Sequence, residues 1–247
     1  MSKSIIIFGF HSIQAQLETT PEGLLKVWTL DNRHDKRLNT ITTQLNQLGV
    51  NTAPVSKQQL DKLTKNQTHQ GIAAEIHLPT LPNQEELMAH IAKLEKPALI
   101  LILDSIQDPR NLGACLRSAN AAGVDCVVIN KDGSAPINAL VHKTSAGALN
   151  QLKIFSVTNL ARTIRALKEA NIWVTGLDGS TNTSLYQIDL TTPSALIMGS
   201  EGSGLRTLTK KSCDQLAMIP MQGNVESLNI SVATGITLFE ASRQRLN

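Results

Sequence analysis

The chain has 247 residues, a formal net charge of +3 and 41% hydrophobic residues. This length suits one or two domains, and an aromatic content of only 3% means that Leu, Ile, Val and Ala must fill their cores. No apolar run approaches the roughly 18–20 residues of a membrane-spanning helix, and the N-terminus lacks a signal-peptide pattern. The mild positive charge permits an RNA partner without requiring one.

Three cysteines, Cys115, Cys126 and Cys213, are widely spaced. An odd number at such spacing indicates neither a disulfide framework nor a zinc site, and it suits a reducing compartment. We therefore expect a cytoplasmic protein with no membrane segment and no metal.

Short apolar runs alternate with helical patterns over 1–78, which predicts a small, compact α/β domain. Pro79 and Pro82 then lie close together, and proline is typical of connectors rather than sheet interiors, so we place a linker at 79–96. The elements predicted before the linker are strands at 27–30, 50–55 and 71–76 and a helix at 35–48.

From residue 97 to 247 the pattern switches repeatedly between strand and helix. Apolar runs without strict alternation are typical of strands covered on both faces, and intervening helices are typical of parallel crossovers. This predicts an α/β domain with a parallel sheet. Its predicted strands lie at 98–104, 124–130, 172–178, 195–199 and 215–220, and its helices at 109–122, 137–149, 159–170 and 229–245.

The first group of polar residues follows the strand at 98–104. Asp108 and Pro109 are a typical helix start, with a capping carboxylate before proline at the first helical position. Asn111 lies in the first turn, just beyond the carboxyl end of a strand, where open α/β sheets bind their ligands. Arg117 lies nearly two turns further on, and an ordinary solvated arginine explains it equally well from the local pattern alone.

A glycine-rich turn from Met198 to Leu205 follows the strand at 195–199. It lacks the ending of a phosphate-binding P-loop and the spacing of a dinucleotide-binding turn, so a plain structural turn is the simpler interpretation. The carboxylate of Glu201 in its middle favours a functional one. Ser227 and Asn229 precede the last predicted helix, where either could simply be its N-cap.

Together the segments DPRNLGACLRSA, IMGSEGSGL and IPMQGNVESLNISVATGITLFEA resemble, in order, the three motifs of the SpoU, or TrmH-like, RNA ribose methyltransferases. The resemblance covers nearly all of 97–247. The segments FGFHSIQAQL and THQGIAAEI resemble the small L30e-like RNA-binding domain of the subfamily that methylates a guanosine in 23S ribosomal RNA. Phe8 is a departure, because the resemblance leads us to expect a tyrosine there.

The resemblance implies transfer of a methyl group from S-adenosylmethionine to a ribose 2′-hydroxyl of 23S rRNA or of a ribosomal precursor. It further implies a homodimer with its active site near the subunit interface, and a sheet whose C-terminal segment forms a deep trefoil knot. Carried over residue by residue, it implies catalytic roles for Asn111, Arg117, Glu201, Ser227 and Asn229. It implies cofactor contacts, largely through backbone groups, at Met198, Gly199, Ser200, Ile219, Met221 and Leu228.

A ribose hydroxyl is a poor nucleophile, so some group must share or remove its proton. Arginine is a very weak base, and we therefore expect Arg117 to clamp an RNA phosphate as a planar fork rather than to take the proton itself. In the N-terminal domain the candidate phosphate contacts, for which a solvated basic face is the alternative, are Arg33, Lys36, Arg37, Lys57, Lys62 and Lys65.

Two alternatives stay open on the sequence. A transfer-RNA ribose methyltransferase of the same family would carry the same three motifs. A non-catalytic RNA-binding protein could share the scaffold, although the five polar motif residues are intact. A nucleotide-dependent dehydrogenase lacks its glycine fingerprint here.

Overall fold

The computed structural model describes residues 4–31, 33, 35–78 and 80–246, and the chain divides into two compact units. The first unit extends to Thr80 and also includes Ile137–Gln151. The second consists of Leu81–Pro136 and the chain from Leu152 onward. We describe each unit by itself.

The first unit contains a four-stranded sheet with the order β1-β4-β2-β3. β4 is antiparallel to both β1 and β2, and β2 is parallel to β3. One face is covered by α1 and α2, whose Ile13 and Leu45 are buried against sheet residues. Buried Leu60 of α3 packs in the cluster on the other face. The elements are β1 (Ser4–Phe8), α1 (Phe10–Thr19), a 3-10 helix (Pro21–Gly23), β2 (Leu24–Leu30), α2 (Lys36–Gln47), β3 (Thr52–Val55), α3 (Lys57–Leu63), β4 (Ile72–His77), α6 (Ala139–Thr144) and α7 (Ala148–Gln151).

The second unit contains a six-stranded sheet with the order β10-β8-β9-β5-β6-β7, parallel throughout. The central strand β5 is fully buried, which explains its unbroken apolar run. The elements are α4 (Gln84–Ile91), β5 (Leu99–Leu103), α5 (Pro109–Ala121), β6 (Cys126–Asn130), β7 (Ile154–Val157), α8 (Leu160–Glu169), β8 (Trp173–Leu177), a 3-10 helix (Leu185–Gln187), β9 (Ser194–Met198), α9 (Thr207–Ser212), β10 (Gln215–Ala217) and α10 (Ile230–Arg245).

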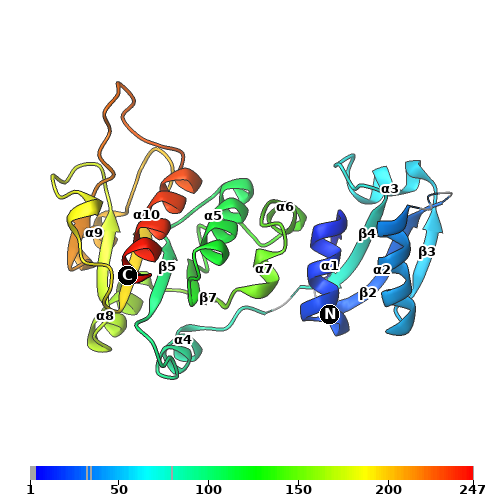
Figure 1. Cartoon of the computed structure of the whole chain (residues 1–247), viewed down its shortest axis with the longest axis horizontal. Coiled ribbons are helices and arrows are strands. Elements are labelled where there is room, and N and C mark those ends of the chain that lie inside the picture. Colours follow the sequence, from blue (N-terminus) through cyan, green and yellow to red (C-terminus); the bar gives the residue numbers. More distant parts are fainter. Residues whose placement is uncertain (1–3, 32, 34, 79, 247) are drawn as a thin grey trace. The chain divides into compact units, whose positions relative to one another are not determined.

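Two helices distant in sequence, α5 and α10, lie against each other in this unit (Figure 1). The Sγ atom of Cys115 on α5 lies 3.4 Å from Oγ1 of Thr234 on α10, and both residues are buried. Gly235 faces α5 too, where an added Cβ would lie 3.7 Å from Oγ of Ser118. This packing brings the two polar motifs at the N-terminal ends of α5 and α10 toward each other.

The structure differs from the expected domain division in two places. Within the expected linker, Gln84–Ile91 form α4 in the second unit, and Leu87 is buried in its core. Asn83 and Glu86 form a capping box, a helix start signal that the nearby prolines obscured. The single helix expected at 137–149 is instead α6 and α7, both in the first unit. Pro79 itself lies outside the described residues.

Candidate active site

The candidate site lies at the carboxyl-terminal edge of the parallel sheet. Strands β8, β9 and β5 are neighbours there and end at Leu177, Met198 and Leu103. Because parallel strands end at the same edge, the segments that follow them meet, which is where open α/β sheets bind their ligands. At this edge the glycine-rich turn follows β9, and the buried Asp104 follows β5.

The turn after β9 requires glycine at its first residue. A Cβ on Gly199 would lie 2.2 Å from the carbonyl carbon of Gly204, a backbone contact that no side chain tolerates. The backbone groups of Ser200 and Gly204 exchange two hydrogen bonds, of 3.0 and 2.9 Å. The turn is therefore closed on itself, and Glu201 is exposed on it.

Asp104 connects this turn to β5. Its carboxylate is fully buried and lies 2.7 Å from Nε of Arg206, whose backbone N–H also donates to it over 3.3 Å. A buried carboxylate is stable only when it is paired and hydrogen-bonded, and both conditions hold here. Asp104 was assigned no role from the sequence, although it is a carboxylate that directly follows an apolar strand.

Asn229 joins the three sequence motifs. Its Nδ2 donates to Oε1 of Glu201 over 2.6 Å and to Oδ1 of Asn111 over 3.2 Å. Its Oδ1 accepts from the backbone N–H of Ser231 over 2.9 Å, so Asn229 is also the N-cap of α10. The capping interpretation and the functional one therefore apply to the same side chain.

A cavity of about 720 Å³ opens beside this cluster, within the size range of small-molecule sites. Its charged lining residues are all acidic: Asp178, Glu201 and Glu226. The wall also contains all six positions expected to contact a cofactor, namely Met198, Gly199, Ser200, Ile219, Met221 and Leu228.

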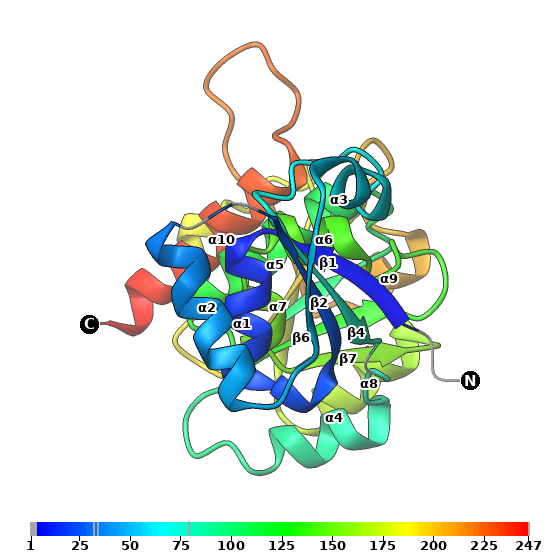
Figure 2. The same cartoon turned by 90° about the vertical axis from the view of Figure 1, so that its right-hand side faces the viewer.

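The structure does not bring the other two expected catalytic residues into contact with this cluster. Arg117 on α5 is exposed, and Ser227 is exposed in the segment before α10 that extends outward in both views (Figures 1 and 2). Neither side chain makes a hydrogen bond or ion pair with another described residue. Ser227 does line the cavity, together with Glu201 and Asn229.

Asp178 is a second acidic residue that sequence reasoning missed. It follows β8 directly and lines the cavity, with Oδ2 2.7 Å from Nζ of Lys210. Burial alone would raise the pKa of its carboxyl, but hydrogen bonds from Lys210 and Ser180 outweigh burial and hold the pKa below its usual value. Asp178 is therefore ionised at neutral pH.

The cysteines do not offer a nucleophile. Burial raises the pKa of the Cys115 and Cys213 thiols to about 11 and that of Cys126 to about 12. Thiols with such pKa values are protonated at neutral pH and unreactive. Among the described residues no group of three His, Cys, Asp or Glu side chains could hold a metal ion, and no described helix is long and apolar enough to cross a membrane.

Comparisons with known proteins agree with this geometry. A family model described as the SpoU rRNA Methylase family matches residues 98–239, and one described as RNA 2′-O ribose methyltransferase substrate binding matches residues 6–82. The 23S rRNA (guanosine-2′-O-)-methyltransferase RlmB of Pectobacterium atrosepticum is 48% identical over 242 residues, which cover 98% of this chain and 99% of that protein. RlmB of Escherichia coli K12 is also 48% identical over 98% of this chain and 99% of its own length.

Solved structures give the same fold. The crystal structure of an RNA 2′-O ribose methyltransferase is 26% identical, with a TM-score of 0.84, and covers 100% of this chain and 90% of its own. The SpoU methyltransferase AviRb from Streptomyces viridochromogenes, solved with AdoMet, has the same TM-score at 22% identity, over 99% of this chain and 91% of its own. The motifs, the parallel sheet and these matches together show that the chain belongs to the SpoU rRNA methylase family.

Proposed function

We propose that this protein transfers a methyl group from S-adenosylmethionine to the ribose 2′-hydroxyl of a guanosine in 23S ribosomal RNA. The observation that carries this function is the meeting of Asn111, Glu201 and Asn229 beside a cavity of cofactor size. The substrate is inferred from the 23S rRNA (guanosine-2′-O-)-methyltransferases that are 48% identical to this chain over nearly its whole length.

The cavity fits S-adenosylmethionine by its chemistry. The cofactor supplies a methyl group activated by a positively charged sulfonium. Glu201 and Glu226 give the wall a negative potential that favours such a cation, whereas the charge of Asp178 is paired with Lys210. Met198, Ile219 and Leu228 offer apolar surface, and the backbone of Gly199 and Ser200 offers hydrogen-bonding groups beside it.

The polar residues have different proposed roles in binding the RNA. Asn111, Glu201 and Asn229 hold each other, so they can orient the ribose without rearranging first. Arg117 is exposed and has no described partner, which leaves its guanidinium free to grip an RNA phosphate in bidentate fashion. Ser227 is exposed on the cavity wall, in reach of an incoming ribose.

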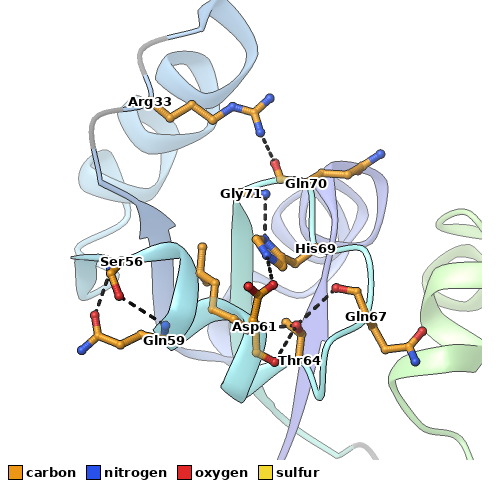
Figure 3. A network of polar contacts seen from close by, with 10 residues as sticks. Arg33, Ser56, Gln59, Asp61, Thr64, Gln67, His69, Gln70 and Gly71 are labelled. Carbon is orange, nitrogen blue, oxygen red and sulfur yellow. Dashed lines mark hydrogen bonds and ion pairs between the residues drawn. The ribbon is translucent and has the colours of Figure 1, made fainter.

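The first unit would dock the RNA, and a network of polar contacts holds its loop between α3 and β4 (Figure 3). His69 accepts from the N–H of Gly71 over 3.0 Å and lies 3.1 Å from Asp61, while Arg33 donates to the carbonyl of Gln70 over 2.6 Å. These bonds fix the loop and leave Lys65 exposed on it.

The basic side chains of this unit are not equally available to phosphates. Arg33 is already bonded to Asp35 and Gln70, and its guanidinium carbon lies 5.3 Å from the ring centroid of Phe10. Arg37 lies 4.8 Å from the same ring. The exposed lysines expected to contact phosphates have neither an ion-pair partner nor a ring contact among the described residues and are better candidates, namely Lys36, Lys57, Lys62 and Lys65.

A homodimer is part of the proposal. Val232, Phe239 and Leu246 follow α10 at intervals of seven residues and are 50%, 52% and 83% exposed. Such spacing places them on one side of the helix, and an exposed apolar stripe is typical of a subunit contact. The trefoil knot and the cytoplasmic location stay predictions.

Methyl transfer from labelled S-adenosylmethionine to 23S rRNA that lacks its ribose methyl groups tests the function. We expect incorporation at one guanosine 2′-oxygen, and its loss in Glu201→Ala. Label confined to transfer RNA would favour the other substrate of the family. Cofactor binding without transfer to any RNA would favour a binding protein on the same scaffold.

A further inference from the structure

Asp178 has a carboxylate in the cavity wall that neither the motifs nor the resemblance assigned. It follows the last residue of β8, at the same sheet edge as the glycine-rich turn, and its side chain is only 8% exposed. Its backbone N–H is fixed by a 2.8 Å bond to the carbonyl of Ala217 on β10. The carboxylate is thus held by the sheet and not by a mobile loop.

The two carboxylate oxygens of Asp178 have different numbers of hydrogen-bond partners. Oδ1 accepts from both the backbone N–H and the hydroxyl of Ser180. Oδ2 is bonded to Lys210 alone, at 2.7 Å. A carboxylate offers about four acceptor positions, so one position on Oδ2 is unfilled.

Oδ2 itself lies near the glycine-rich turn. Oδ2 is 4.0 Å from the place a Cβ on Gly204 would take, and Gly204 lines the same cavity. Because Gly204 has no side chain, nothing on that residue covers the oxygen. Lys210 also bonds to Ser180 over 3.3 Å, so the three side chains form a closed group that holds the carboxylate in place.

We propose that Oδ2 of Asp178 accepts a hydrogen bond from a ribose hydroxyl of S-adenosylmethionine, which makes Asp178 a cofactor-binding residue. This inference rests on the proposed function of the cavity. A carboxylate at the end of a parallel strand recognises a ribose in dinucleotide-binding sheets for the same physical reason: the hydroxyl donates and the ionised oxygen accepts.

The test measures binding by calorimetry, without turnover. S-adenosylhomocysteine and its 2′-deoxy and 3′-deoxy analogues are titrated into the full-length wild type, Asp178→Asn and Asp178→Ala. We expect Asp178→Ala to raise the Kd of S-adenosylhomocysteine about 10- to 100-fold, the usual range for a hydrogen bond to a charged group. One deoxy analogue should bind the wild type more weakly by a similar factor and should lose little further in the variant.

The matched control is Glu169→Gln, an exposed carboxylate on α8 of the same unit, which should leave every Kd unchanged. Equal weakening of all three ligands by Asp178→Ala, or no weakening, would overturn the assignment. The deoxy analogues also test it on the wild type alone, so a variant that folds poorly does not decide the outcome. If the wild type binds no S-adenosylhomocysteine at all, the proposed function of the cavity fails as well, and the two failures are distinguished.

Discussion

Asn229 donates a 2.6 Å hydrogen bond to Glu201 while its other amide atom, Oδ1, caps α10. Each end of the amide therefore has its own partner, and the two roles can be separated by substitution. Asparagine and aspartate are about equally good N-caps, but only asparagine can donate to a carboxylate.

Asn229→Asp should keep α10 and lose activity. The new carboxylate still caps the helix but faces Glu201, so the donor is replaced by a repulsive contact. We expect methyl transfer to fall about 10- to 100-fold, the range for losing a hydrogen bond to a charged group, with little change in Tm. Asn159→Asp at the N-cap of α8 is the control and should leave both unchanged. If the Tm of Asn229→Asp falls by several degrees together with the activity, Asn229 is mainly structural.

Gly199→Ala should destabilise the second unit and weaken cofactor binding. The added Cβ meets the backbone of Gly204 and Leu205 at 2.2–2.4 Å, so the turn must open. Such overpacking costs about 1–3 kcal/mol or more, which lowers Tm by about 2–4 °C per kcal/mol. In Gly223→Ala the Cβ meets nothing within 4 Å, so this variant is the control in thermal unfolding. An unchanged Tm in Gly199→Ala would contradict the close approach.

Arg117→Lys should reduce turnover without changing stability. Lysine keeps the charge but not the planar fork, so a bidentate phosphate contact is lost. We expect at least about a tenfold fall in kcat/KM, equivalent to about 1.4 kcal/mol. Arg162→Lys, an exposed arginine on α8, is the matched control. Near-normal turnover of Arg117→Lys would exclude the bidentate clamp.

Lys62→Ala with Lys65→Ala should weaken RNA binding and make it less dependent on salt. Each lost phosphate contact reduces the slope of log K against log salt by about 0.7–0.9, so the double variant should lose about 1.5. The measurement is the affinity of the full chain for an rRNA fragment over a salt series. Lys93→Ala with Lys153→Ala in the second unit is the control pair. If the salt dependence is unchanged in Lys62→Ala with Lys65→Ala, these two lysines do not contact RNA phosphates.

His142 should make the first unit sensitive to acid. Burial lowers the pKa of its imidazole to about 4, and its Nε2 has no hydrogen-bond partner among the described residues. Because the folded-state pKa lies below the unfolded value of about 6.5, stability is complete above pH 6.5 and falls as the pH decreases toward 4. The slope from this group approaches about 1.4 kcal/mol per pH unit.

The measurement is thermal unfolding at pH 7 and pH 5, followed by Trp28 fluorescence in a Trp173→Phe background. His142→Leu should flatten the pH dependence, whereas His77→Leu, at an exposed position on β4, should keep it. An equal slope in wild type and His142→Leu would show that His142 does not control this effect.

The sequence by itself determined the parallel sheet, because apolar runs such as β5 are long enough to identify and are bounded by helix start signals at Asp108 and Asn229. The resemblance to a known family pointed to six positions for cofactor contacts, and all six lie in the cavity wall. The sequence pattern missed β1, α1, α3, α4, β7 and α9, since short elements carry too little periodicity to be separated from connectors.

Only the tertiary structure decided which polar residues act together. Asn111, Glu201 and Asn229 are separated by up to 118 residues, and they meet because β5 and β9 are neighbours and α5 packs on α10. It likewise placed Asp178 in the cavity and left Arg117 outside the cluster. A local pattern reports what a residue does within its own helix or strand, whereas contacts across the sheet edge depend on strand order, which no local pattern contains.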